Sequence, residues 1–216
     1  MRLLLAISVV LISHQLYAGI FDSAAVLGDG YVAMYETRIV ESPNSPFTVV
    51  LDGGTAGNVT IEGNNTFEIR SGTFTDLDAH DQAIVILYGG STFGDGVRAY
   101  DNSTITIFDG SFPEDVTSYG GTVNVHGGVL GNGAIIQMGG TLNIFGTELV
   151  ATFDHYDDAD LDTTYRVKGK FADGINFAFG VTVNENSSMI LHTVPEPSTA
   201  LLILLGLPLT WRRGIQ

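Results

Sequence analysis

The chain has 216 residues, of which 24 are acidic and 9 are basic, so its formal net charge at pH 7 is −15. This charge excludes a nucleic-acid binder, because such proteins hold phosphate groups with Lys and Arg. Only 15% of the residues are charged, whereas 27 are Gly and 44% are hydrophobic, which is typical of an all-β protein with many turns. Cysteine is absent, which excludes disulfides, thiolate metal sites and Cys nucleophiles.

Residues 1–18 predict a secretory signal peptide. Arg2 precedes an apolar run over residues 3–12, and Leu16 and Ala18 occupy the positions that signal peptidase reads before its cut. The apolar run is about half as long as a membrane-spanning helix. We therefore expect signal peptidase to act on this chain and the remainder to be exported.

A repeat of 17 to 21 residues follows within the body of the chain, residues 19–193. Its pattern is apolar-x-apolar-x-x-Gly, where the alternation predicts a short strand and Gly predicts the turn that ends it. The copies start at Val49, Phe67, Ile84, Ile105, Val123 and, in degenerate form, Leu142. A unit of this size cannot bury its own apolar face, so neighbouring units must stack.

The repeat predicts an all-β fold, a parallel β-solenoid of about six coils over residues 47–147. Three internal ladders are expected, one per inward-facing position: Phe74, Phe93 and Phe112; Ile84, Ile105, Val123 and Leu142; and Ile86, Ile107, Val125 and Ile144. A β-sandwich of hairpins is the competing architecture. The solenoid is favoured because a sandwich gives no reason for a sustained period.

The period breaks after residue 147, and we expect β caps at both ends of the solenoid, because open sheet edges pair with other chains. Residues 148–193 predict the C-terminal cap, with strands over 165–171, 175–183 and 189–192. Residues 20–46 predict the N-terminal cap. No linker separates these parts, so the body is expected to be one domain.

The last segment, residues 194–216, has three parts in a fixed order. Pro195, Glu196 and Pro197 form an extended, accessible motif because proline breaks regular structure. An apolar run over 200–211 follows, and then the basic pair of Arg212 and Arg213, which holds that end on the cytoplasmic side.

This tail resembles the PEP-CTERM sorting signal of exported bacterial proteins, which belong to exopolysaccharide- and biofilm-associated systems. The resemblance implies that an exosortase, a membrane protease-transpeptidase, recognises Pro195, Glu196 and Pro197. It also implies a short hydrophobic helix as a transient anchor, a stop signal at Arg212 and Arg213, and exopolysaccharide as a candidate partner. A helix over residues 200–211 would be about 18 Å long, against a bilayer core of about 30 Å. The tail is therefore either cleaved or retained as a short anchor.

Candidate chemistry in the body consists of two acidic clusters. Five carboxylates of one loop could bind calcium, although their spacing is not that of an EF-hand loop: Asp154, Asp157, Asp158, Asp160 and Asp162. Asp76, Asp78, His80 and Asp81 form the second cluster. For both, a solvated surface is the favoured interpretation, and we expect no cofactor and no catalytic residue.

Two function classes remain. The first is an exported, non-catalytic structural or adhesive protein of the cell envelope or extracellular matrix, anchored in the membrane before processing and then placed at the cell surface. The second is a small carbohydrate-binding or polysaccharide-degrading β-helix, since this fold often carries such activities. The first is favoured because the body has few cations and its negative charge repels acidic polymers.

Overall fold

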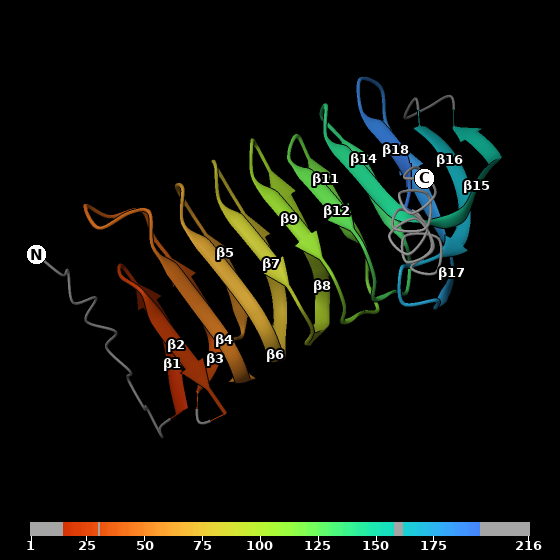
Figure 1. Ribbon diagram of the computed structural model, residues 1–216. Coiled ribbons are helices and arrows are strands. Elements are labelled where there is room, and N and C mark those ends of the chain that lie inside the picture. Colours follow the sequence, from red (N-terminus) through yellow and green to blue (C-terminus); the bar gives the residue numbers. More distant parts are fainter. Residues whose placement is uncertain (1–14, 30, 158–161, 195–216) are drawn as a thin grey trace, which may run out of the picture.

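The protein is described by a computed structural model that covers residues 15–29, 31–157 and 162–194. Every regular element in these ranges is a β-strand, and most strand pairs are parallel. Figure 1 shows the strands stacked along one axis, with the N-terminal coil at one end and the C-terminal coil at the other. The expected parallel β-solenoid is confirmed.

The first column of parallel strands contains one strand per coil. It runs through β2 (Ala25–Gly28), β4 (Thr48–Thr55), the start of β6 (Thr66–Ala79), β7 (Ile84–Leu87), β9 (Thr104–Ile107), β12 (Thr122–Val125), the start of β15 (Thr141–Asp157) and β18 (Ser188–Thr193). The chain therefore makes about seven turns, one more than the six expected.

The second column lies on another side of the same coils. It runs through β1 (Gln15–Phe21), β3 (Val32–Ile39), β5 (Asn58–Ile61), the end of β6, the end of β8 (Ser91–Tyr100), β11 (Val116–Tyr119), β14 (Ala134–Gln137) and β17 (Asn176–Val183). A short third column at one corner contains β10 (Ser111–Phe112) and β13 (Val129–Leu130).

The core consists of residues that occupy the same place in successive coils. In the first column, inward-facing residues alternate with outward-facing ones because successive side chains of a strand point to opposite faces. One inward ladder contains Val49, Phe67, Val85, Ile105, Val123 and Leu142, and each of these is at most 1% exposed. The expected ladder through Ile105, Val123 and Leu142 is thus confirmed.

The prediction for the coil that starts at Ile84 is wrong by one residue. Val85 and Leu87 are fully buried, whereas Ile84 is 43% exposed and Ile86 points outward beside Glu68 and Thr106. Residues 84–87 are all apolar, so the alternation fits both registers. The backbone selects one of them, because Ile84 N donates to Asn65 O at 2.9 Å and aligns this strand with β6.

The expected Phe ladder is correct at two positions and wrong at Phe93. Phe74 and Phe112 are fully buried, but Phe93 is 63% exposed, and Thr92 takes the inward place beside Phe74. Phe74 and Phe112 each follow a turn Gly by two residues, whereas Phe93 follows Gly90 by three. One additional residue moves a strand side chain to the opposite face.

The N-terminal segment expected as a cap adds a further coil, since β2 and β3 pair in parallel with β4 and β5. Strand β1 begins at Gln15, so the expected cut after Ala18 falls inside this strand. Residues 19–21 would remain paired with Thr37, Arg38 and Ile39 of β3.

The C-terminal segment leaves the coil and then returns to it. The end of β15 pairs antiparallel with β16 (Asp162–Lys170), and β16 pairs antiparallel with β17. In Figure 1 the β15–β16 hairpin extends beyond the solenoid. Strand β16 covers the edge of the second column, and its Val167 is fully buried in the core. Residues 148–193 therefore close this end, as expected, and also complete the last coil.

Residues 1–14 of the expected signal peptide and the expected tail helix lie outside the described residues. Within the described part of the chain, no helix is long and apolar enough to span a bilayer.

Candidate functional site

The sorting residues predicted from the sequence lie beyond the described part of the chain. These residues are Pro195, Glu196, Pro197, Arg212 and Arg213. The structure describes the place from which they leave: Val194 N donates to Gly146 O at 2.9 Å, at the end of the last coil. The proline motif therefore follows directly on the folded body.

The acidic loop does not gather its described carboxylates around one point. Asp157 and Asp162 face each other across the β15–β16 hairpin, and Asp162 Oδ1 accepts a hydrogen bond from Asn184 Nδ2 at 2.7 Å. Asp154 lies 3.8 Å from the ring of His155. Asp158 and Asp160 are outside the described residues. Within the ranges described, no group of three or more His, Asp or Glu side chains is arranged to hold a metal ion.

The second acidic cluster is engaged in contacts between coils. Asp78 Oδ1 lies 3.1 Å from Arg98 Nη1, one coil further on, and the His80 ring stacks on Tyr100 with centroids 4.5 Å apart. Burial acts to lower the pKa of Arg98, but the hydrogen bond and the charge of Asp78 outweigh it, so the pKa is raised. These contacts give the cluster a structural role.

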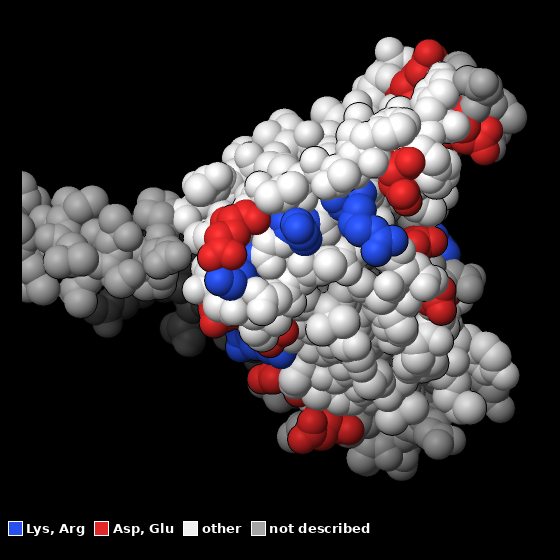
Figure 2. Space-filling model, turned by 90° about the vertical axis from the view of Figure 1, so that its right-hand side faces the viewer, with Lys and Arg blue, Asp and Glu red and all other residues white. Residues whose placement is uncertain are grey.

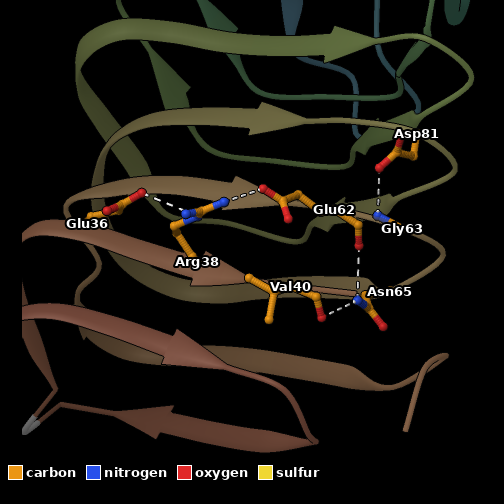
Figure 3. A network of polar contacts seen from close by, with 7 residues as sticks. All are labelled: Glu36, Arg38, Val40, Glu62, Gly63, Asn65 and Asp81. Carbon is orange, nitrogen blue, oxygen red and sulfur yellow. Dashed lines mark hydrogen bonds and ion pairs between the residues drawn. The ribbon is translucent and has the colours of Figure 1, made fainter. Parts of the chain in front are cut away.

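Asp81 belongs to a polar network that joins the early coils (Figure 3). Its Oδ2 accepts from Gly63 N at 3.0 Å, and its own backbone adopts a φ of 58°. The fully buried Asn65 lies one turn away, where its amide nitrogen donates to Val40 O at 3.1 Å and Glu62 O at 3.0 Å. Such bonds satisfy the buried Asn65 amide and partly buried backbone carbonyls at the corner of the coil.

Arg38 occupies the outer side of the same network. Figure 3 shows its guanidinium between Glu36 and Glu62, at 3.5 Å and 2.5 Å from their carboxylate oxygens. Since these side chains are substantially exposed, the ion pairs position the strands and contribute little stability.

Five rings form a continuous stack along the outside of the first column, a feature that the repeat analysis missed. Successive centroids are 5.4, 4.9, 4.0 and 4.4 Å apart along the series Tyr88, Phe108, His126, Phe145 and His192. Each ring stands one position after the second inward residue of its coil. Counting that position through the repeat would have revealed the stack.

The rings of this stack cover one another's faces. Interplanar angles of 7° to 21° leave mainly the ring edges toward solvent. A sugar ring stacks on the face of an aromatic ring, so only the two ends of the series offer that contact.

The two histidines of the stack are held by their surroundings. His192 Nε2 lies 2.9 Å from Asn143 Oδ1. The pKa of His126 is lowered, first by burial and then by the charge of His192.

A row of cations crosses the C-terminal cap, and we call Arg166, Lys168 and Lys170 the β16 basic strip. They alternate along β16 and therefore share one face, while Val167 between them is buried. Lys170 Nζ lies 2.7 Å from Glu148 Oε1. A shallow hollow of about 310 Å³ beside Lys168 is lined by Glu148, Gly169, Asn176 and Phe177.

Figure 2, which looks at the C-terminal end, shows Lys and Arg side chains gathered across this end with Asp and Glu on either side. The low number of cations in the body is evident from the sequence, but the common surface of these three is not. Their alternation is a signal that the sequence contains.

The chain matches no protein-family model, no curated protein and no solved structure.

Proposed function

We propose that this chain is an exported, non-catalytic structural or adhesive protein of the cell envelope or extracellular matrix. It is sorted through Pro195, Glu196 and Pro197, an apolar segment and the Arg212–Arg213 pair, and its processing partners are signal peptidase and an exosortase-type enzyme. The observation that carries the proposal is the position of the proline motif, which begins directly after Val194, the last described residue, which is hydrogen-bonded to the last coil. Cleavage at this motif would leave every described strand of the body intact.

The contacts of the body support a non-catalytic role. Two side chains that could perform acid–base chemistry are engaged with residues one coil away: Asp78 with Arg98, and His126 between two Phe rings. General acid–base catalysis needs such groups free to reach a substrate. The competing function, a carbohydrate-binding or polysaccharide-degrading β-helix, has less support because the ring stack turns its edges outward.

Intact mass spectrometry of the protein recovered from its native host tests the sorting proposal. We expect a mature chain that starts near Gly19 and ends near Pro195 to Pro197. Glu196→Gln should retain the full C-terminus. Glu185→Gln, which removes the same charge at an exposed turn of the body, should be processed normally. A wild-type chain with an intact C-terminus in both envelope and medium fractions would contradict the proposal.

A further inference from the structure

We propose that the β16 basic strip docks on the anionic headgroups of the bilayer in which the C-terminal tail is anchored. The strip thereby holds the solenoid with its C-terminal end against the membrane surface and its N-terminal coil away from it. This inference rests on the proposed function, because the tail must first place the body beside a bilayer.

The distribution of cations singles out this end of the molecule. Residues 19–194 contain 23 acidic side chains and only 6 basic ones, and three of the six form the strip. The other three, Arg38, Arg70 and Arg98, each lie within 3.5 Å of a carboxylate. Arg166 and Lys168 are exposed, and neither forms an ion pair with any residue that the structure describes.

The surroundings of the strip allow a flat surface to approach it. Arg166 is flanked by Thr152 on β15 and Gly180 on β17, and Lys168 by Val150 and Ala178. All four neighbours are uncharged and exposed. From Arg166 to Lys170 the strip extends over about 14 Å, at roughly 3.4 Å per residue. Among the described residues, Glu148 contacts Lys170 at one end of the strip, and Asp154, Asp157 and Asp162 lie in the β15–β16 hairpin at the other end.

The tail leaves the body next to the strip. Val194 is bonded to Gly146, and the following residue, Thr147, is paired with Lys170. The apolar run begins at Ala200, six residues after Val194, and that connection spans at most about 22 Å. An anchor in the bilayer therefore keeps the strip close to the headgroups.

Tethering also favours a bilayer over the other anionic partners. The body carries a net charge near −17, so a free acidic polymer or a second copy of the chain is repelled by most of its surface. Because the tail is anchored in the same bilayer, the strip meets a high effective concentration of headgroups. Partners that are free in solution lack this advantage. Each Lys or Arg near an anionic bilayer increases the binding constant about fivefold.

The test uses the full chain reconstituted in vesicles of equimolar phosphatidylglycerol and phosphatidylcholine, or of phosphatidylcholine alone. The chain has no Cys, so a single introduced one takes a fluorophore uniquely. Energy transfer to a headgroup acceptor is measured from Ala172→Cys, in the turn after β16, and from Ser23→Cys, in the first coil. The Arg166→Gln/Lys168→Gln double variant is compared with Arg38→Gln/Arg70→Gln, which removes the same charge elsewhere.

We expect strong transfer from position 172 and weak transfer from position 23 in anionic vesicles. The strip variant should lower the ratio of docked to undocked chains roughly thirtyfold, as high salt should, while the control variant should not. The inference is overturned if energy transfer from position 172 is equal in the strip variant and the wild type. It is also overturned if the wild type gives equal transfer in vesicles of both lipid compositions.

Two further outcomes assign the strip to another partner and overturn the bilayer assignment. In the first, the strip variant loses binding to alginate but gives the same energy transfer as the wild type. In the second, the wild type forms a dimer without vesicles and the strip variant does not. Failure of the chain to enter either kind of vesicle contradicts the anchor of the proposed function and removes the inference with it. Incorporation without strip dependence overturns the inference alone.

Discussion

The regular coils and the C-terminal cap bury their apolar residues by different means. In the coils from β4 to β14, each inward residue lies on the equivalent residue of the next coil, so one pattern is repeated along the axis. In the cap, β15, β16 and β17 form an antiparallel sheet in which Val167 and Phe179 pair across strands. The coils gain stability from repetition, whereas the cap contributes a unique closing surface.

The outward faces of these two regions also differ. In the coils the outer side chains contact each other along the axis, as in the stack of Phe108, His126 and Phe145. In the cap, Arg166 and Lys168 have no next coil to contact, and they remain exposed. Among the described residues, the exposed cations without an ion pair therefore lie where the repeat ends.

The largest effect is expected inside the coils. Phe112→Ala should lower the free energy of unfolding by about 3 to 5 kcal/mol, because it leaves a cavity in an internal ladder. Phe93→Ala, the same change at a 63% exposed position, should cost less than about 1 kcal/mol. Urea unfolding of both variants measures this difference. Equal losses would contradict the register in which Thr92 replaces Phe93 in the core.

A smaller loss of stability is expected at the corner where the first coils join. Asn65→Ala should cost about 2 kcal/mol, because it leaves the buried Phe47 N–H and the partly buried carbonyls of Val40 and Glu62 without their partner. Asn64→Ala, at the exposed neighbouring position, serves as the control in the same urea unfolding experiment. A neutral Asn65→Ala variant would show that water replaces these bonds.

A pH-dependent effect is expected in the ring stack. Because the pKa of His126 is lowered in the folded protein, the unfolded chain binds a proton first as the pH falls through the ordinary value of 6.5. Stability should therefore decrease below that pH and level off once His126 is protonated in the folded state. His126→Phe should flatten this decrease in thermal unfolding, whereas Phe145→Leu should lower stability to a similar extent at every pH. An unchanged acid slope in His126→Phe would exclude His126 as its source.

The smallest effect on folding is expected in the cap. Arg166→Gln/Lys168→Gln should change the free energy of unfolding by less than about 0.5 kcal/mol, because both side chains are exposed and form no ion pair with the described residues. Val167→Ala between them should cost about 2 kcal/mol, since Val167 is fully buried. If the double variant lost as much free energy of unfolding as Val167→Ala does, the strip would have a structural role.

The sequence by itself determined the fold class, the period and most of the core. The apolar-x-apolar-x-x-Gly copies at Val49, Phe67, Ile105, Val123 and Leu142 coincide with strands of one column. This succeeds because a strand has a two-residue period and because a short repeat can bury its apolar face only by stacking. The turn at residues 172–174 and the last strands were also predicted, since Gly and Asp mark turns between alternating segments.

The register of residues 84–87 and the placement of the basic strip depend on the packing of the whole chain, whereas the spacing of Phe93 from Gly90 already indicates that it points outward. An all-apolar stretch fits either face, so the hydrogen bonds to the preceding coil select its register. Likewise, Arg166, Lys168 and Lys170 form a surface because β16 leaves the coil and closes its end. The spacing of residues encodes which side chains share a face of a strand, but only the packing of the whole chain determines what that face meets.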